Sequence, residues 1–162
     1  MDNSNQAAAI EMNRDPADIR RWQRLDARTT TSGRLEDADV ARLAAIGVKH
    51  VINLALDSHP EALAREGEKL AARGIGYTHI PVPFDAPDAT HFTAFCDALL
   101  ACKDVPVHLH CIMNYRVSAF YYRLNRDHRG MDEAQARAQM EMQWAPDKSN
   151  RPEYAVWADF IK

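Results

Sequence analysis

The hydrophobic and polar positions of this chain alternate in a way that predicts strands interleaved with helices. Short runs rich in β-branched and aliphatic residues predict strands at 22–27, 48–56, 75–82 and 105–109. Helical spacing of apolar residues, clearest over 35–46, predicts helices at 35–46, 60–73, 89–102, 117–128, 131–144 and 153–161. Glycines that favour helix ends follow three of these segments, at Gly47, Gly74 and Gly130. Residues 29–33 are predicted to form a polar loop.

This alternation predicts an α/β fold with a central, mostly parallel sheet and helices on both faces. We expect one domain over residues 19–162, preceded by a flexible lead-in over residues 1–18. In sheets of this kind the reactive site lies beyond the carboxyl ends of the strands.

Composition narrows the functional classes. The net charge of −3 argues against a protein that binds nucleic acid through bulk positive charge. No apolar run reaches the roughly 18–20 residues that span a bilayer, so we expect no membrane partner, and the polar N-terminus does not resemble a secretory signal. Three cysteines without framework spacing indicate free thiols and a cytoplasmic location. The histidines fit no metal-binding spacing, so we predict neither a metal nor a cofactor; the oligomeric state stays open.

The candidate chemistry lies in residues 107–118. A short apolar run ends in His110 and Cys111, Arg116 follows after four residues, and Ser118 precedes a predicted helix. The amides of a helix N-terminus bind anions, and an arginine grips a tetrahedral oxyanion with two hydrogen bonds. The helix dipole and the arginine also stabilise a thiolate. Cys111 is therefore a candidate nucleophile toward phosphorus or sulfur, whereas the other two cysteines are predicted to pack in the core.

With these residues, the chain resembles the protein tyrosine phosphatase superfamily, in its small bacterial dual-specificity-phosphatase-like branch. The resemblance runs from Arg28 to the helix after Arg116. It includes residues 31–33 before the first helix, Gly47 and Val48 leading into 51–54, and Gly74 and Ile75 leading into 77–82.

The resemblance implies hydrolysis of a phosphate monoester in two steps. Cys111 would attack phosphorus to form a phosphocysteine, which water then hydrolyses, without a metal. His110 would orient the loop, and Ser118 would donate a hydrogen bond to the cysteine sulfur. The oxygens of the phosphate would be held by the loop residues Ile112, Met113, Asn114, Tyr115 and Arg116. The substrate would be a phosphorylated protein or small molecule.

The loop departs from the family pattern. It has four residues between Cys111 and Arg116, one fewer than is usual, and none of them is glycine. Either the loop is one residue shorter, or the arginine has moved forward while Ser118 keeps the usual hydroxyl position. Asn114 stands where a glycine is usual, and asparagine tolerates the left-handed backbone of such a turn.

The general acid is expected on the loop over residues 83–88. Asp85 is the first candidate, because the neighbouring Phe84 and Pro87 offer a partly apolar setting in which a carboxylic acid stays protonated. Asp88 is the second, although it also suits the N-cap of the next helix. Asp57 is a weaker third candidate.

Three functions compete. The first is a cysteine-dependent phosphatase. The second is a sulfurtransferase of the rhodanese type, because a cysteine, four residues and an arginine also describe the short loop of those enzymes. The third is a pseudo-phosphatase that binds phosphate groups without turnover.

Overall fold

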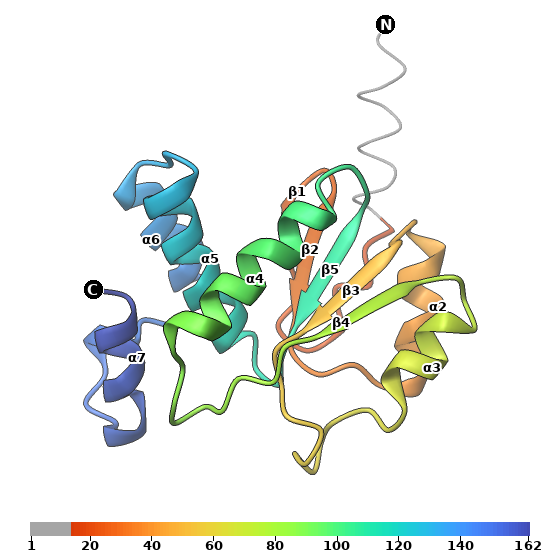
Figure 1. Ribbon diagram of the computed structural model, residues 1–162, viewed down its shortest axis with the longest axis horizontal. Coiled ribbons are helices and arrows are strands. Elements are labelled where there is room, and N and C mark those ends of the chain that lie inside the picture. Colours follow the sequence, from red (N-terminus) through yellow and green to blue (C-terminus); the bar gives the residue numbers. More distant parts are fainter. Residues whose placement is uncertain (1–13) are drawn as a thin grey trace, which may run out of the picture.

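The centre of the molecule is a five-stranded sheet in the order β1-β2-β5-β3-β4 (Figure 1). The computed structural model describes residues 14–162. Its strands are β1 (Gln23–Asp26), β2 (Thr29–Ser32), β3 (His50–Asn53), β4 (Gly76–His79) and β5 (Val107–His110). Only β1 and β2 pair antiparallel; β2, β5, β3 and β4 run parallel. The predicted α/β fold with a mostly parallel sheet is therefore confirmed.

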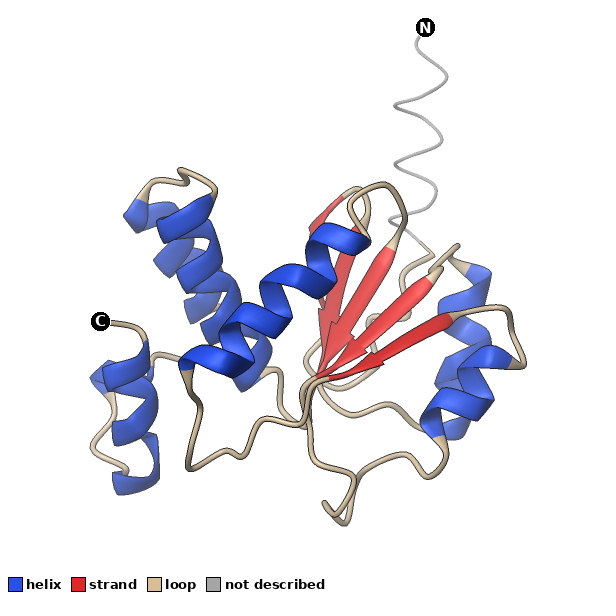
Figure 2. Cartoon of the chain, viewed as in Figure 1, coloured by secondary structure: helices blue, strands red, loops and turns tan. Residues whose placement is uncertain are grey.

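Helices cover both faces of this sheet (Figure 2). The α-helices in the described residues are α2 (Asp37–Ala45), α3 (Glu66–Ala71), α4 (Ala89–Ala101), α5 (Tyr115–His128), α6 (Glu133–Glu141) and α7 (Ala155–Phe160), with 3₁₀ helices η1 (Pro146–Lys148) and η2 (Pro152–Tyr154). Successive strand residues point to opposite faces. Thus Val51 packs in the core that includes Val40, Leu43 and Leu70 from α2 and α3, and Ile52 packs in the larger core on the other face.

The prediction of a loop over residues 29–33 is wrong, because Thr29–Ser32 forms β2. This strand pairs with β1 on one side and with β5 on the other. Its hydroxyls would be costly to bury alone, but Thr30 and Ser32 each place an oxygen 2.8 Å from a ring nitrogen of His108 on β5. The polar pattern of these residues predicts a loop, because the histidine that satisfies their hydroxyls lies too far away in the sequence for a local pattern to reveal it.

The helix predicted over 60–73 is also largely wrong, since α3 begins only at Glu66. The residues before it form turns, and Arg65 has the left-handed φ of 53°. The other helices agree with the prediction more closely, although the one predicted over 117–128 begins at Tyr115 and the one over 153–161 is divided into η2 and α7. The long loop before α3 matters because it runs toward the cysteine.

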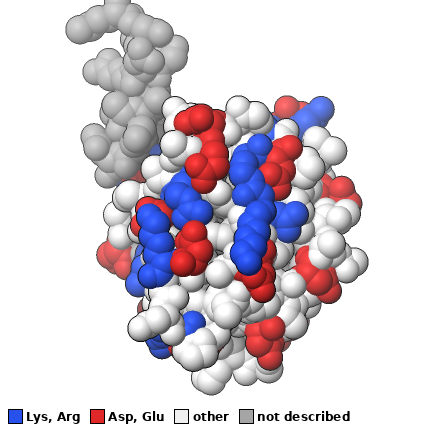
Figure 3. Space-filling model, turned by 90° about the vertical axis from the view of Figure 1, so that its left-hand side faces the viewer, with Lys and Arg blue, Asp and Glu red and all other residues white. Residues whose placement is uncertain are grey.

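The lead-in expected over residues 1–18 lies mostly outside the described residues. Within the described part, Asp15 accepts hydrogen bonds from Trp22 and Arg24. No helix among residues 14–162 is long and apolar enough to cross a membrane. On the face that Figure 3 shows, basic and acidic side chains are interspersed rather than gathered by sign. Ion pairs of this mixed kind include those of Arg137 with Glu133, Glu141 and Asp147.

The buried His108 leads to a prediction about stability and pH. Burial, followed by electrostatic interactions with His110 and Arg24, lowers the pKa of His108 well below its ordinary value of 6.5. Below about pH 6.5 the unfolded chain therefore binds a proton at His108, whereas the folded chain does not. The contribution of neutral His108 to the free energy of unfolding is complete above that pH and is lost as the pH falls. Between pH 7.5 and 5.5 the free energy of unfolding should decrease by about 1.4 kcal/mol through this group.

Urea denaturation of the wild type and of His108→Gln at both pH values measures this term. The glutamine variant should lose less stability on acidification by about that amount, because its side chain does not titrate. An equal loss in both proteins would contradict the prediction.

Candidate active site

Cys111 lies directly after the central strand β5, at the carboxyl end of the parallel strands. The chain then turns within three residues and enters α5 at Tyr115. The turn needs a left-handed residue, and Asn114 supplies it with φ of 63°. The side-chain nitrogen of Asn114, Nδ2, donates to the carbonyl oxygen of Arg21 at 2.9 Å and to the hydroxyl of Thr31 at 3.0 Å. These contacts hold the turn against β2 and the segment that precedes β1.

The cysteine loop, residues 111–116, presents the N-terminus of α5 to the thiol. The amide of Ser118 donates to the carbonyl oxygen of Asn114 at 3.1 Å, so backbone bonding of α5 begins there. The amides nearer the start of a helix have no acceptor within it and favour an anion. The loop is also packed tightly from behind: Arg34 donates its amide to the carbonyl oxygen of Ile112 at 3.0 Å, and a Cβ at Gly33 would overlap that same oxygen.

Arg116 is a buried cation without a carboxylate partner among the described residues. It is only 6 % exposed. One guanidinium nitrogen, Nη1, donates to the carbonyl oxygen of Val82 at 2.8 Å, while Nε is buried with no hydrogen-bond partner in the described residues. The guanidinium carbon lies 5.7 Å from the ring centre of Phe84. A buried charge is costly unless it is paired, so this arrangement favours an anion at the site.

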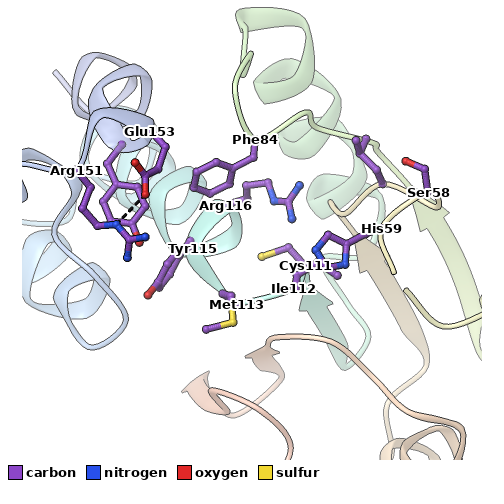
Figure 4. A pocket seen from close by; sticks show the side chains of 12 residues that line it. Ser58, His59, Phe84, Cys111, Ile112, Met113, Tyr115, Arg116, Arg151 and Glu153 are labelled. Carbon is purple, nitrogen blue, oxygen red and sulfur yellow. Dashed lines mark hydrogen bonds and ion pairs between the residues drawn. The ribbon is translucent and has the colours of Figure 1, made fainter. Parts of the chain in front are cut away.

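A cavity of about 400 Å³ opens over the loop. In Figure 4 the guanidinium of Arg116 and the imidazole of His59 both point toward the side chain of Cys111. The lining residues are Leu56, Ser58, His59, Phe84, Cys111, Ile112, Met113, Tyr115, Arg116, Arg151, Glu153 and Tyr154. The cavity thus combines a thiol and a cation at its base with aromatic and aliphatic walls.

The aromatic walls are held by the C-terminal part of the chain. Tyr115 stacks on Trp144, with ring centres 4.4 Å apart and planes inclined by 3°. Phe84 packs against Trp144, Tyr154 and Trp157, and Trp157 donates its ring N–H to the Phe84 carbonyl oxygen at 2.7 Å. These contacts hold Phe84, in the loop over 83–88, beside the cavity.

The carboxylates considered for the general acid lie outside the cavity lining. Asp85 is exposed, although it directly follows Phe84, which lines the cavity. Asp88 is the N-cap of α4, where its side chain accepts from the amide of His91 at 3.0 Å. Asp57 is exposed and lies 3.8 Å from a ring nitrogen of His79. The carboxylate that does line the cavity is Glu153, whose pKa is lowered first by a backbone hydrogen bond and then by Arg151, which keeps it ionised.

Two supporting residues lie on different sides of the loop. The hydroxyl of Ser118 donates to the carbonyl oxygen of Tyr115 at 3.0 Å and faces a separate small cavity, lined also by Thr31 and Tyr121. His110 is buried, and its Nδ1 lies 3.0 Å from the carbonyl oxygen of Cys111. Of the predicted phosphate-binding residues, Asn114 does not line the cavity, whereas Ile112, Met113, Tyr115 and Arg116 do.

His59 is a cavity residue that sequence reasoning missed. Its Nδ1 accepts the amide of Glu61 at 3.0 Å, so its neutral ring carries the proton on Nε2. The residue lies in the segment predicted to enter a helix, and nothing in that pattern indicates that the segment loops toward Cys111. Among residues 14–162, no group of three or more histidine, cysteine, aspartate or glutamate residues could hold a metal ion.

No protein-family model and no curated protein matches the sequence. Solved structures do match. A candidate phosphatase (DUF442) from Shewanella putrefaciens CN-32 is 28% identical, with a TM-score of 0.76 over 91% of this chain and 94% of that chain. TpbA of P. aeruginosa in complex with phosphotyrosine is 17% identical, with a TM-score of 0.65 over 87% and 88% of the two chains. Tk-PTP in its active form is 18% identical, with a TM-score of 0.66 over 86% and 95%.

These likenesses cover nearly the whole described chain and agree on one architecture. They confirm at the level of the fold the resemblance that the cysteine loop and its flanking segments indicate. The chain has the fold of the protein tyrosine phosphatase superfamily, in its dual-specificity-phosphatase-like form.

Proposed function

We propose that this protein is a cysteine-dependent phosphatase that hydrolyses phosphate monoesters through a phosphocysteine intermediate. The observation that carries the proposal is the buried guanidinium of Arg116, which has no carboxylate partner among the described residues and lines the same cavity as Cys111. The negative charge of a phosphate group bound there would compensate the positive charge of Arg116. We place the protein in the cytoplasm, consistent with three free cysteines in the described residues.

In the proposed reaction the Cys111 thiolate attacks phosphorus. A sulfur–phosphorus bond forms, the bond to the leaving oxygen breaks, and that oxygen takes a proton from the general acid. Water then attacks phosphorus, returns a proton to the same group, and frees phosphate and the thiolate. Arg116 and the amides of residues 112–116 stabilise the charge on the equatorial oxygens, which is the largest expected contribution to the rate. The covalent intermediate divides one difficult step into two easier ones.

The side chains that form the cavity walls indicate which class of substrate to test. Phe84, Tyr115 and Tyr154 line the cavity, and the rings of Phe84 and Tyr115 each meet that of Tyr154 edge-on. Flat apolar groups pack well against aromatic walls, so aryl phosphates are the first substrates to test. A phosphorylated protein and a small phosphorylated molecule both remain within the proposal.

A second candidate is a sulfurtransferase, favoured by the four residues between Cys111 and Arg116. In that reaction the thiolate takes the outer sulfur of thiosulfate, sulfite leaves, and the persulfide passes its sulfur to cyanide as thiocyanate. The same short loop also leaves open a pseudo-phosphatase that binds phosphate groups without turnover.

The nucleophile and the anion cradle are tested together. We expect the wild type to release phosphate from 4-nitrophenyl phosphate, and Cys111→Ser to release none while still binding vanadate. Arg116→Lys keeps the charge but loses the planar fork of donors, so kcat/KM should fall by about two to three orders of magnitude.

The same preparations distinguish the alternatives. Thiocyanate formation from thiosulfate and cyanide, without phosphate release, would replace the phosphatase with the sulfurtransferase. If the protein binds vanadate but shows neither activity, only the hypothesis of a pseudo-phosphatase would fit the result.

We propose Asp85 as the general acid, with the loop over 83–88 bringing it to the cavity in the substrate complex. Asp85→Asn should slow phenyl phosphate, a poor leaving group, by about two orders of magnitude, and 4-nitrophenyl phosphate much less. Steady-state kinetics on the two esters measure this difference.

The matched variants are His59→Asn, which removes the cavity histidine, and Asp88→Asn, which removes the carboxylate of Asp88 but keeps a helix N-cap. Neither should show the dependence on the leaving group. If His59→Asn shows it and Asp85→Asn does not, the acid is the histidine that already lines the cavity. A larger effect of Asp88→Asn would likewise overturn the assignment.

A further inference from the structure

A buried pair of titratable side chains lies behind the cysteine loop, outside the cavity. Nε2 of His110 is 2.8 Å from Oε2 of Glu66, and the two side chains are only 3% and 4% exposed. They come from β5 and α3 and are 44 residues apart in the sequence. The other ring nitrogen of His110 faces the carbonyl oxygen of Cys111 at 3.0 Å. A glutamate is thereby connected to the backbone of the proposed nucleophile through one imidazole.

Counting donors restricts the protonation of this pair. A carbonyl oxygen only accepts, so Nδ1 of His110 carries a hydrogen. A second hydrogen must lie between Nε2 and the carboxyl oxygen of Glu66, because otherwise two acceptors would face each other at 2.8 Å. The pair is therefore either an imidazolium with a carboxylate or a neutral ring with a carboxylic acid.

The neighbours of Glu66 favour the carboxylate. The hydroxyl of Tyr77 on β4 lies near Glu66, and its oxygen accepts from the side-chain amide of Asn53 at 3.1 Å, so its one hydrogen can point toward the carboxylate. Burial, and then the charge of Glu66, raise the pKa of Tyr77 far above its ordinary value, so the hydroxyl stays protonated. Asn53 is itself fixed, because its carbonyl oxygen accepts the amide of Ala55 at 2.8 Å. A carboxylate that accepts a hydrogen bond from His110 and has a hydroxyl donor close by is favoured over the acid.

The charges around His110 agree with this assignment. The ring of His108 stacks on that of His110 with centres 6.3 Å apart, and burial keeps His108 neutral. The titratable groups that face His110 are thus Glu66 from α3, with Tyr77 from β4 behind it, His108 from the same strand, and Cys111 itself.

We propose that Glu66 is a positioning residue that holds His110 as an imidazolium beside Cys111. The charge adds to Arg116 and to the N-terminus of α5 in stabilising the Cys111 thiolate, while the Nδ1 hydrogen bond fixes the start of the loop. Resemblance to the phosphatases implies only that His110 orients the loop. This inference adds the residue that sets its charge, and it rests on the proposed role of Cys111 as a nucleophile.

The test is the pH dependence of Cys111 alkylation by iodoacetamide in the absence of substrate. Trypsin releases residues 104–116 as one peptide that contains no other cysteine, so mass spectrometry follows Cys111 separately from Cys96 and Cys102. In Glu66→Gln the amide donates to Nε2 and leaves the ring neutral. The midpoint of alkylation should move to higher pH by about one unit, which lowers the rate about tenfold at pH values below both midpoints.

The matched control is Tyr77→Phe, which removes the hydroxyl near Glu66 but keeps the charge of Glu66, and should move the midpoint much less. The rate at the high-pH plateau should be equal in all three proteins, because it reports access to the thiol. An unchanged midpoint in folded Glu66→Gln, or an equal shift in Tyr77→Phe, would overturn the proposal.

The wild type supplies an independent measurement that does not depend on folding of the variant. Nitrogen chemical shifts of the His110 ring should show hydrogens on both Nδ1 and Nε2 at pH 7, and a single hydrogen on Nδ1 would overturn the proposal. Neither measurement needs turnover. If Cys111 alkylation depends on Glu66 but no phosphate ester is hydrolysed, the proposed phosphatase fails while the positioning role of Glu66 stands.

Discussion

The site depends on a single backbone constraint: the chain must pass from β5 to α5 within a few residues. The left-handed conformation of Asn114, with φ of 63°, makes this turn possible. Because the turn is so short, the amides at the start of α5 face the thiol at the end of β5, and Arg116 falls in the first turn of the helix. The side-chain bonds of Asn114 to Arg21 and Thr31 offset the strain of the turn.

Local pattern predicts the parts of this fold that local forces stabilise. Gly47 and Gly74 end their helices with positive φ, as their positions indicate. The cysteine loop is recognisable from the sequence because its strand, thiol, arginine and helix are consecutive. Contacts between distant residues are not. The sequence predicts a loop at Ser32 because its partner His108 is 76 residues away, and neither His59 nor Glu66 carries a sequence signal of its contact with the loop. The neighbours of Asp85 predict an apolar setting, yet Asp85 is exposed.

The buried polar groups around the loop form two sets, one of neutral hydrogen-bonded groups and one that contains the pair of Glu66 and His110. Thr30, Ser32 and His108 satisfy one another as neutral groups and join β2 to β5. Glu66 pairs with His110, and Tyr77 and Asn53 hydrogen-bond to each other nearby, where the proposed imidazolium is compensated by the carboxylate. The central strand thus carries two histidines, two residues apart, in different electrostatic environments. Under the proposed charge of His110, the cation lies against its carboxylate and apart from the neutral groups that join β2 to β5.

The wall that Trp144, Tyr154 and Trp157 build has a consequence for how the protein is made. These residues follow Cys111 by more than thirty positions, so the ribosome releases the cysteine loop well before the aromatic residues that close its cavity. During that interval a nascent chain exposes Phe84, Tyr115 and a thiol on an open apolar surface. Because domains fold as units during synthesis, the nascent chain is most vulnerable to oxidation and to binding by chaperones at this stage.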